Sequence, residues 1–341
     1  MRSALPVLLV FGSVLHADDP TSLPDFSSAS ILSHATFLAG KELIGRKAGT
    51  EHERIAAVYI SSRLDAGRVP PPPKKKRLQS FALSAQPKNG DPRSQNVLGW
   101  IEGSDLNLKG EVVVLGAHYD HLGETPAGVC LGADDNASGV AVLIEVAAAL
   151  AANKTGLGRS VLVAFFGAEE IGLVGSRHFV KQPSVPIESI VAMVNVDMIG
   201  RPLADQLALK PLLKLAGVDE RGIGVVGVKD SPFLRELIET ACAQAKVPVF
   251  GTKVVPVVSD VVESMAKNRG DHAPFEEKGI PVAFFGSGES DDYHKPTDTI
   301  DKLDAKLMAS RARALYGTIV LLTKAPREKL AGATRPGESP K

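Results

Sequence analysis

Short apolar runs alternate along the chain with longer stretches that repeat at helical spacing. Runs rich in β-branched and aromatic residues are typical of strands buried on both faces of a sheet. Two shorter runs, 81–83 and 96–101, are further strand candidates. The pattern therefore predicts a largely parallel sheet, whose central strands are the runs 111–116, 160–166, 190–196 and 280–285.

Amphipathic segments occur before, between and after these runs. Val140, Leu143, Ile144, Ala147 and Leu150 follow i, i+3, i+4, i+7 spacing, which is typical of a helix packed on a sheet. Further helices are predicted at 29–38, 51–64, 231–245 and 304–322.

Two of these helices carry more detailed predictions. In 51–64, Ile55, Val58, Tyr59 and, less regularly, Leu64 share one face, which we expect to be the apolar one. At 231–245, Ser231 is placed as the N-cap and Pro232 as the first helical residue.

Strands that alternate with helices predict an α/β fold, a three-layer α/β/α sandwich with a mostly parallel, mixed central sheet. Ligands of such sheets bind outside the carboxyl ends of the strands. We find neither an internal repeat nor a linker, so residues 18–326 are expected to form a single domain. Residues 327–341 are rich in proline, glycine and charge and are predicted to be a flexible tail.

The first 17 residues have the pattern of a secretory signal peptide. Arg2 gives a positive start, residues 5–15 are largely apolar, and residues 15–17 form an imperfect small-residue cleavage site. The apolar run is too short for a permanent membrane span, and no other segment is long and uniformly apolar enough for one. The protein is expected to be secreted or periplasmic.

Charge and cysteine content exclude several classes of function. Lysine plus arginine and aspartate plus glutamate number 39 each, so no global field favours nucleic acid or an anionic membrane as a partner. The basic cluster 74–77 is interpreted as a solvated loop. The two cysteines have no C-x-x-C neighbour, which argues against a thiolate zinc site. Nothing fixes the oligomeric state, and we expect a monomer.

Side chains that can bind metal ions lie close after four of the apolar runs. Asp134 and Asp135 also stand together in a glycine-bracketed loop before an apolar helix, where their charges repel unless a cation, a helix N-terminus or a proton relieves them. Each candidate is weak alone, but nitrogen and oxygen donors together suit Zn²⁺, Mn²⁺ or Co²⁺. Two-metal hydrolases also need a bridging carboxylate, which a loop aspartate can supply. The sequence thus predicts a pair of metal ions near His118, Glu169, Glu170, Asp197 and His294.

Five spaced motifs occur in the order found in the secreted two-zinc aminopeptidases of metallopeptidase clan MH. That group also includes glutaminyl cyclases and glutamate-carboxypeptidase-like enzymes. The resemblance runs from about Asn96 to Asp301 and implies a zinc-exopeptidase-like fold. The motifs are His118-Tyr119-Asp120, 132–139, Ala168-Glu169-Glu170, 195–200 and Tyr293-His294.

The resemblance also implies roles for these residues. The residue that matches Asp135 bridges two zinc ions. Those that match His118 and Asp197 complete one site, and those that match Glu170 and His294 complete the other. The residue that matches Glu169 is the general base. Two Zn²⁺ ions are therefore expected, although Mn²⁺ or Co²⁺ could use the same ligands.

Supporting roles follow for the neighbouring residues. Asp120 would hydrogen-bond the far ring nitrogen of His118 and fix its tautomer. Tyr293 would donate to the oxyanion or simply line the pocket. Family members tend to have a cis peptide after the bridging aspartate, here Asp135–Asn136. They often read Ser-Asp-His where this chain has Gly270-Asp271-His272, so a supporting contact is expected to be lost. His121 is interpreted as structural.

The expected function is hydrolysis of the N-terminal residue from peptides by a metal-bound hydroxide, with Glu169 as general base. A glutaminyl cyclase-like enzyme with one zinc, a carboxypeptidase on the same fold and a binding module without catalysis remain alternatives. The G-x-G-x-x-G match at 222–227 has no preceding strand, so a dinucleotide enzyme is discounted. No G-x-S-x-G nucleophile elbow is present.

Overall fold

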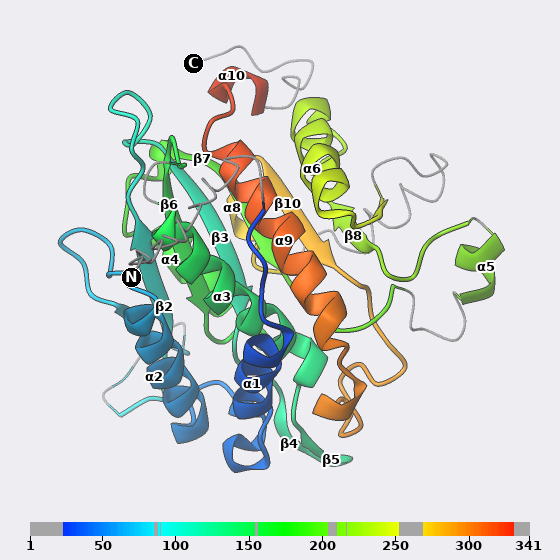
Figure 1. The fold of residues 1–341 in the computed structure, drawn as a ribbon. Helices are drawn as coiled ribbons and strands as arrows, with labels where there is room; N and C mark the ends of the chain where they lie inside the picture. The colour runs from blue at the N-terminus through cyan, green and yellow to red at the C-terminus, as the bar shows by residue number, and fades with distance from the viewer. Residues whose placement is uncertain are drawn as a thin grey trace, which may run out of the picture.

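A central sheet of eight strands organises the molecule in the computed structural model (Figure 1). The structure describes residues 23–84, 88, 90–153, 156–203, 210–215, 217–251 and 269–330. The predicted signal peptide lies outside these ranges. The strand order is β1-β2-β6-β3-β7-β10-β8-β9, and a small hairpin, β4-β5, lies apart from the sheet.

The sheet is mixed, with a parallel centre. Strand β3 pairs in parallel with β6 and β7, and β7 with β10, while β2, β1 and β8 add antiparallel pairs. The predicted mixed sheet is confirmed. The strands are β1 Leu78–Ala82, β2 Arg93–Ile101, β3 Val112–His118, β4 Gly123–Thr125, β5 Gly128–Cys130, β6 Ser160–Phe166, β7 Ile190–Val196, β8 Ile223–Val226, β9 Val249–Phe250 and β10 Val282–Gly286.

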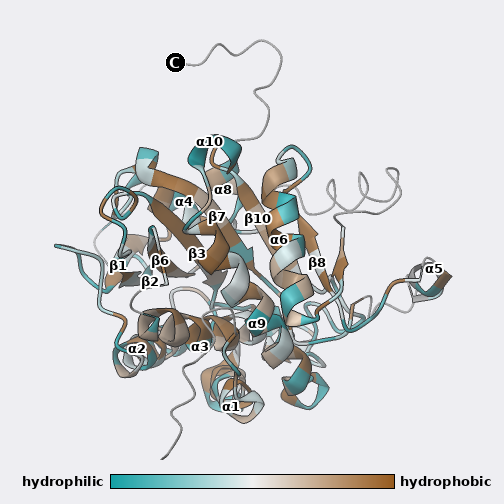
Figure 2. Cartoon of the chain, turned by 45° about the horizontal axis from the view of Figure 1, so that its top comes forward, coloured by the Kyte–Doolittle hydropathy of each residue, from teal (hydrophilic) through white to brown (hydrophobic). Residues whose placement is uncertain are grey.

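Helices cover both faces of the sheet, so the three-layer fold is also confirmed (Figures 1 and 2). One face carries α1 Ser28–Leu38, α2 Glu51–Ala66, α3 Gly139–Ala152, α6 Pro232–Ala245 and α9 Ala305–Leu322. The other carries α4 Val174–Lys181 and α8 Ala273–Glu276. The remaining described helical segments are η1 Lys41–Arg46, η2 Ala133–Ser138, η3 Ile187–Ser189, α5 Lys210–Leu215, η4 Ile300–Lys302 and α10 Arg327–Leu330.

The alternation of side chains along the central strands explains their continuous apolar runs. In β3, Val113 and Leu115 join the larger core under the five helices, while Val112 and Val114 join the smaller core against α4 and α8. Every residue of β3, β6 and β7 is buried. A strand with two covered faces therefore cannot show polar alternation.

Helix α2 turns a different face to the core from the predicted one. Ile55 and Val58 are 37% and 50% exposed, whereas Ala56, Ala57 and Ile60 are fully buried. The helix is confirmed, and Leu64 is buried as expected. Ile55 and Val58 were placed on the wrong face, because Ala56, Ala57 and Ile60 form the contact with the core.

The C-terminal segment corrects a further prediction. Residues Arg327–Leu330 form α10, and Leu330 is buried, so the predicted tail begins too early. Ser231 is the N-cap and Pro232 the first residue of α6, as predicted, although the Ser231 hydroxyl donates to the Leu330 carbonyl at 3.0 Å rather than to the start of the helix. Residues 331–341 lie outside the described ranges.

One run among the described residues, Ala133–Ala152, is apolar and long enough to cross a membrane by composition, contrary to the prediction that none is. Of its most apolar window, 72% is buried inside the fold, as expected for a core helix.

Candidate metal centre

The predicted site residues meet at one edge of the sheet. His118 ends β3, Asp197 follows β7, and Glu169 and Glu170 follow β6. Because these three strands are parallel neighbours in register, their carboxyl ends lie together. The loop after β10 adds His294, and segment η2 adds Asp135.

Two groups of donor atoms share the carboxylate of Asp135. In the first group, the His118 Nε2 atom lies 3.3 Å from Asp135 Oδ1 and 3.2 Å from Asp197 Oδ1. In the second group, the His294 Nε2 atom lies 3.3 Å from Asp135 Oδ2 and 3.2 Å from Glu170 Oε2. Each oxygen of Asp135 therefore belongs to a different group.

These separations suit cation ligands. Zinc binds nitrogen and oxygen donors at about 2.0–2.1 Å, which sets neighbouring donors of a tetrahedral site roughly 3.3 Å apart. Both groups combine imidazole and carboxylate donors without sulfur, a set that suits Zn²⁺, Mn²⁺ or Co²⁺. The residues present therefore fit two metal ions that share Asp135.

The electrostatics of the centre show an excess of buried carboxylates. Burial disfavours the charged form of His118, but the Asp197 and Glu169 carboxylates outweigh burial and raise its pKa well above the usual value. Burial is likewise outweighed at His294, where the carboxylates of Asp135 and Glu170 raise the pKa to about 10. These raised pKa values show that both imidazoles lie beside an excess of buried negative charge. A bound cation would neutralise that charge.

Glu169 lies beside the two donor groups but belongs to neither. One of its oxygens lies within 4.8 Å of a His118 ring nitrogen and a Glu170 oxygen, a third combination of donors that could hold a cation. Burial raises the pKa of Glu169 well above its usual value, and the carboxylates of Asp271, Asp197 and Glu170 add to this shift.

Asp120 has a different contact from the predicted one. Its carboxylate stays 3.9 Å from His118 Nδ1 and instead accepts the backbone N–H groups of Glu169 at 2.9 Å and Glu170 at 3.3 Å. The Asp120 backbone carbonyl lies 3.2 Å from His118 Nδ1. Because a carbonyl can only accept, it still favours the tautomer that leaves Nε2 bare. The carboxylate therefore positions the glutamate loop rather than the imidazole.

Tyr293 stacks on His294, with ring centroids 3.8 Å apart and planes inclined by 23°. Burial raises the pKa of Tyr293, and the carboxylates of Asp135 and Glu170 raise it further. The phenol therefore keeps its proton and remains a hydrogen-bond donor near the donor groups.

His121 is part of the centre, contrary to its interpretation as a structural residue. The residue is 1% exposed, and its Nδ1 atom lies 2.6 Å from Glu170 Oε1 and 3.7 Å from Asp135 Oδ2. Its place directly after Asp120 in a metal-binding motif was the signal that could have identified it.

Two more residues, neither of them predicted from the sequence, hold the Asp135 loop. The Asp298 carboxylate accepts the backbone N–H groups of Asp134 at 3.0 Å and Asp135 at 3.1 Å. The buried Arg46 guanidinium donates to the carbonyls of Leu38, Tyr119, Leu131 and Gly132. No local pattern marks either residue, because both act on segments far away in the sequence. The expected cis peptide, Asp135–Asn136, is present.

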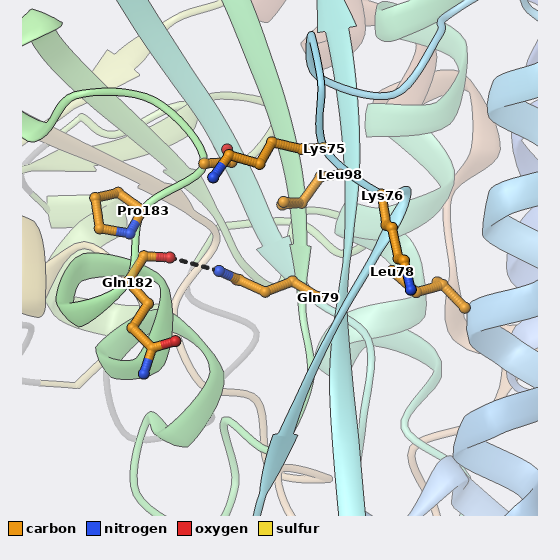
Figure 3. A pocket seen from close by; sticks show the side chains of 8 residues that line it. Lys75, Lys76, Leu78, Gln79, Leu98, Gln182 and Pro183 are labelled. Carbon is orange, nitrogen blue, oxygen red and sulfur yellow. Dashed lines mark hydrogen bonds between the residues drawn. The ribbon is translucent and has the colours of Figure 1, made fainter.

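A cavity at the β1 edge of the sheet contains none of these residues (Figure 3). Its lining includes Lys75 and Lys76, which are exposed as predicted for the basic loop. The side-chain amide of Gln79 donates to the Gln182 carbonyl at 2.6 Å across it.

Comparisons with known proteins connect this arrangement with peptidases. Residues 96–319 match the sequence profile described as Peptidase family M28. Leupeptin-inactivating enzyme 1 of Streptomyces exfoliatus is 28% identical over 297 residues, covering 86% of this chain and 56% of the relative. A probable leucine aminopeptidase of Trichophyton verrucosum is 28% identical over 216 residues, covering 61% and 53%. The chain thus spans about half the length of these relatives.

Solved structures share the fold. A zinc aminopeptidase from Bacillus subtilis has a TM-score of 0.63 and 17% identity, with 87% of this chain and 95% of that one covered. A Porphyromonas gingivalis glutaminyl cyclase has a TM-score of 0.60 and 18% identity, with 86% and 98% covered.

Proposed function

The chain belongs to peptidase family M28, and from this premise we propose that it is a zinc-dependent aminopeptidase that removes the N-terminal residue from peptides. The observation that carries the proposal is the pair of donor groups, which share Asp135 and have separations of 3.2 and 3.3 Å between donor atoms. Several relatives are named as aminopeptidases, which supports a peptide substrate.

Each donor group would hold one zinc ion. His118 and Asp197 with Asp135 Oδ1 form the first site, and Glu170 and His294 with Asp135 Oδ2 form the second. Manganese or cobalt could use the same donors. When bound, the two ions would polarise the substrate carbonyl and lower the pKa of a water molecule.

Glu169 is the proposed general base. Because its carboxylate belongs to neither donor group, it is free to accept a proton from water at one oxygen. The same carboxyl group would then give this proton to the nitrogen of the departing amine. The backbone of Glu169 is held by Asp120, so the carboxylate is presented from a fixed loop.

Tyr293 would stabilise the substrate oxygen as it becomes negative. Its hydroxyl retains the proton, because burial and the nearby carboxylates raise its pKa. A protonated hydroxyl can donate a hydrogen bond to that oxygen, and preorganised donors of this kind lower the barrier of acyl transfer.

We further propose that the protein is exported. The predicted signal peptide supports this location, and so does a relative named as a probable lipoprotein aminopeptidase of Mycobacterium tuberculosis. That relative is 30% identical over 234 residues, covering 62% of this chain and 42% of its own length.

A matched pair of peptides tests the proposed reaction. The zinc-loaded full chain is expected to release the first residue of a peptide with a free N-terminus. It should cleave the acetylated form at least about 100-fold more slowly, which corresponds to an activation free energy that is higher by roughly 3 kcal/mol. Equal cleavage of both peptides would contradict an aminopeptidase. Cyclisation of an N-terminal glutamine without release of a residue would instead support the cyclase alternative.

A further inference from the structure

Glu170 contacts two imidazoles, and only one of the contacts has the geometry expected of two ligands on one cation. Its Oε2 atom lies 3.2 Å from His294 Nε2, close to the spacing of tetrahedral donors. Its Oε1 atom lies 2.6 Å from His121 Nδ1. That distance is too short for two donors on one zinc ion and fits a hydrogen bond to a charged carboxylate, about 2.7 Å.

The surroundings of His121 indicate which ring nitrogen carries the hydrogen. The Nε2 atom is buried and has no hydrogen-bond partner among the residues that the structure describes. An unpaired buried N–H group is costly, about 1–3 kcal/mol, so a neutral ring places its hydrogen on Nδ1, where Glu170 accepts it.

The ring of His121 is also fixed in place. A side-chain Cβ at Gly132 would lie 2.5 Å from the His121 Cγ atom, so the ring packs directly on that backbone. On another side it meets the His294 ring edge-to-face, with centroids 5.7 Å apart. A hydrogen bond from so constrained a ring gives the carboxylate one orientation.

We propose that His121 is a positioning residue, whose Nδ1–H group holds Glu170 Oε1 and directs Oε2 toward the site shared with His294 and Asp135. Without this donor, the carboxylate would rotate between orientations, and the second site would lose preorganisation. The inference rests on the proposed two-zinc function and adds a residue to its second site only.

Zinc titration of the full chain tests the proposal. The protein is stripped with a chelator and titrated with Zn²⁺ against a chromophoric competitor. Wild type is expected to bind two ions. His121→Leu should weaken one of them about 10–100-fold, the usual effect of losing a ligand's hydrogen-bond partner, and leave the other within about threefold.

Two amide variants distinguish the hydrogen bond from simple packing. His121→Asn places a donor near the position of Nδ1 and should restore the weakened site to within about threefold of wild type. His121→Gln places its amide farther out and should behave as the leucine variant does. If the leucine variant fails to fold, the comparison of the asparagine and glutamine variants still tests the proposal.

His34 provides a matched control. It is a buried imidazole whose Nε2 lies 3.0 Å from Glu145 Oε1, outside the metal centre. His34→Leu should lower thermal stability without changing either zinc affinity.

Different results would contradict the positioning role of His121 and the proposed function of the chain. Wild-type affinity at both sites in His121→Leu, equal weakening of both sites, or no recovery in His121→Asn would each overturn the positioning role. A wild-type chain that binds fewer than two zinc ions would overturn the proposed function itself, and this inference with it.

Discussion

At the scale of single residues, two adjacent glutamates are given opposite properties by their partners. Glu170 is held by two imidazoles, which outweigh burial and lower its pKa. At Glu169, burial and the carboxylates of Asp271, Asp197 and Glu170 outweigh the His118 imidazole, so the pKa of Glu169 is raised. The first environment suits a permanent ligand, and the second suits a group that gains and loses a proton.

Glu169→Gln should therefore keep both zinc ions and lose about 10²–10⁴-fold in kcat, the usual contribution of general acid–base catalysis. Zinc content by elemental analysis and turnover of a free peptide give the two readouts. Asp135→Ala is the contrasting control, because it removes a donor from both groups and should lose both ions. More than a tenth of wild-type turnover in Glu169→Gln would show that another group is the base.

A second residue-scale feature surrounds Gly270, where the resemblance suggested a lost contact. Neither side-chain polar atom of buried Asn195, nor the Nδ1 atom of His272, has a hydrogen-bond partner among the described residues. A Cβ at Gly270 would lie 3.2 Å from both Asn195 Nδ2 and His272 Nδ1. Unpaired polar groups thus converge on the space beside this glycine.

Two substitutions at Gly270 separate bulk from hydrogen bonding. Gly270→Ser and Gly270→Ala add the same Cβ, but only serine adds a hydroxyl that these groups can share. We expect the unfolding free energy of the serine variant to be about 1–2 kcal/mol higher than that of the alanine variant. Chemical denaturation at one fixed zinc concentration measures the difference. An alanine variant as stable as the serine variant would contradict this view.

At the scale of elements, helix α2 is tied to the site through Glu53. This buried carboxylate accepts the Ser94 hydroxyl from β2 and the Gly49 backbone N–H, and it also accepts the N–H of Ala168, next to Glu169. Burial, with a contribution from the Asp120 carboxylate, raises the pKa of Glu53 from 4.5 to about 8. Its folded form therefore binds a proton more tightly than its unfolded form does.

Stability should consequently depend on pH through Glu53. The contribution of protonated Glu53 to the unfolding free energy is fully present below pH 4.5 and is lost as pH rises to about 8. Glu53→Gln mimics the protonated form, because the Ser94 hydroxyl can reverse and accept from the new amide. The variant should match wild type near pH 5 and exceed it at pH 9, by at most about 5 kcal/mol. A variant-minus-wild-type difference in unfolding free energy that does not change between these pH values would contradict the assignment.

Elements buried on both faces were the most predictable from sequence. Strands β6 and β7 have the predicted bounds, because each is an almost entirely apolar run between charged or turn-forming segments. The face of α2 was mispredicted in part, because two of the residues that form it are alanines, which give only a weak apolar signal. The short α10 was missed, because four residues cannot show a periodic pattern.

At the scale of the whole molecule, the sheet brings distant motifs together. The order of the motifs and their places after strands were visible in the sequence, and the parallel centre of the sheet explains why such side chains converge. The supporting contacts of Arg46, Glu53 and Asp298 could not be predicted, because each joins segments that only the fold makes neighbours. Arg46 and Glu53 also lie before residues 96–319, the range that the family profile matches.

The central claim is that two zinc ions share the Asp135 carboxylate, and anomalous diffraction at the zinc edge tests it most directly. Crystals of the zinc-loaded protein should show two peaks about 3.5–4 Å apart, one toward His118 and Asp197 and the other toward Glu170 and His294. A single peak, or peaks away from Asp135, would contradict the account.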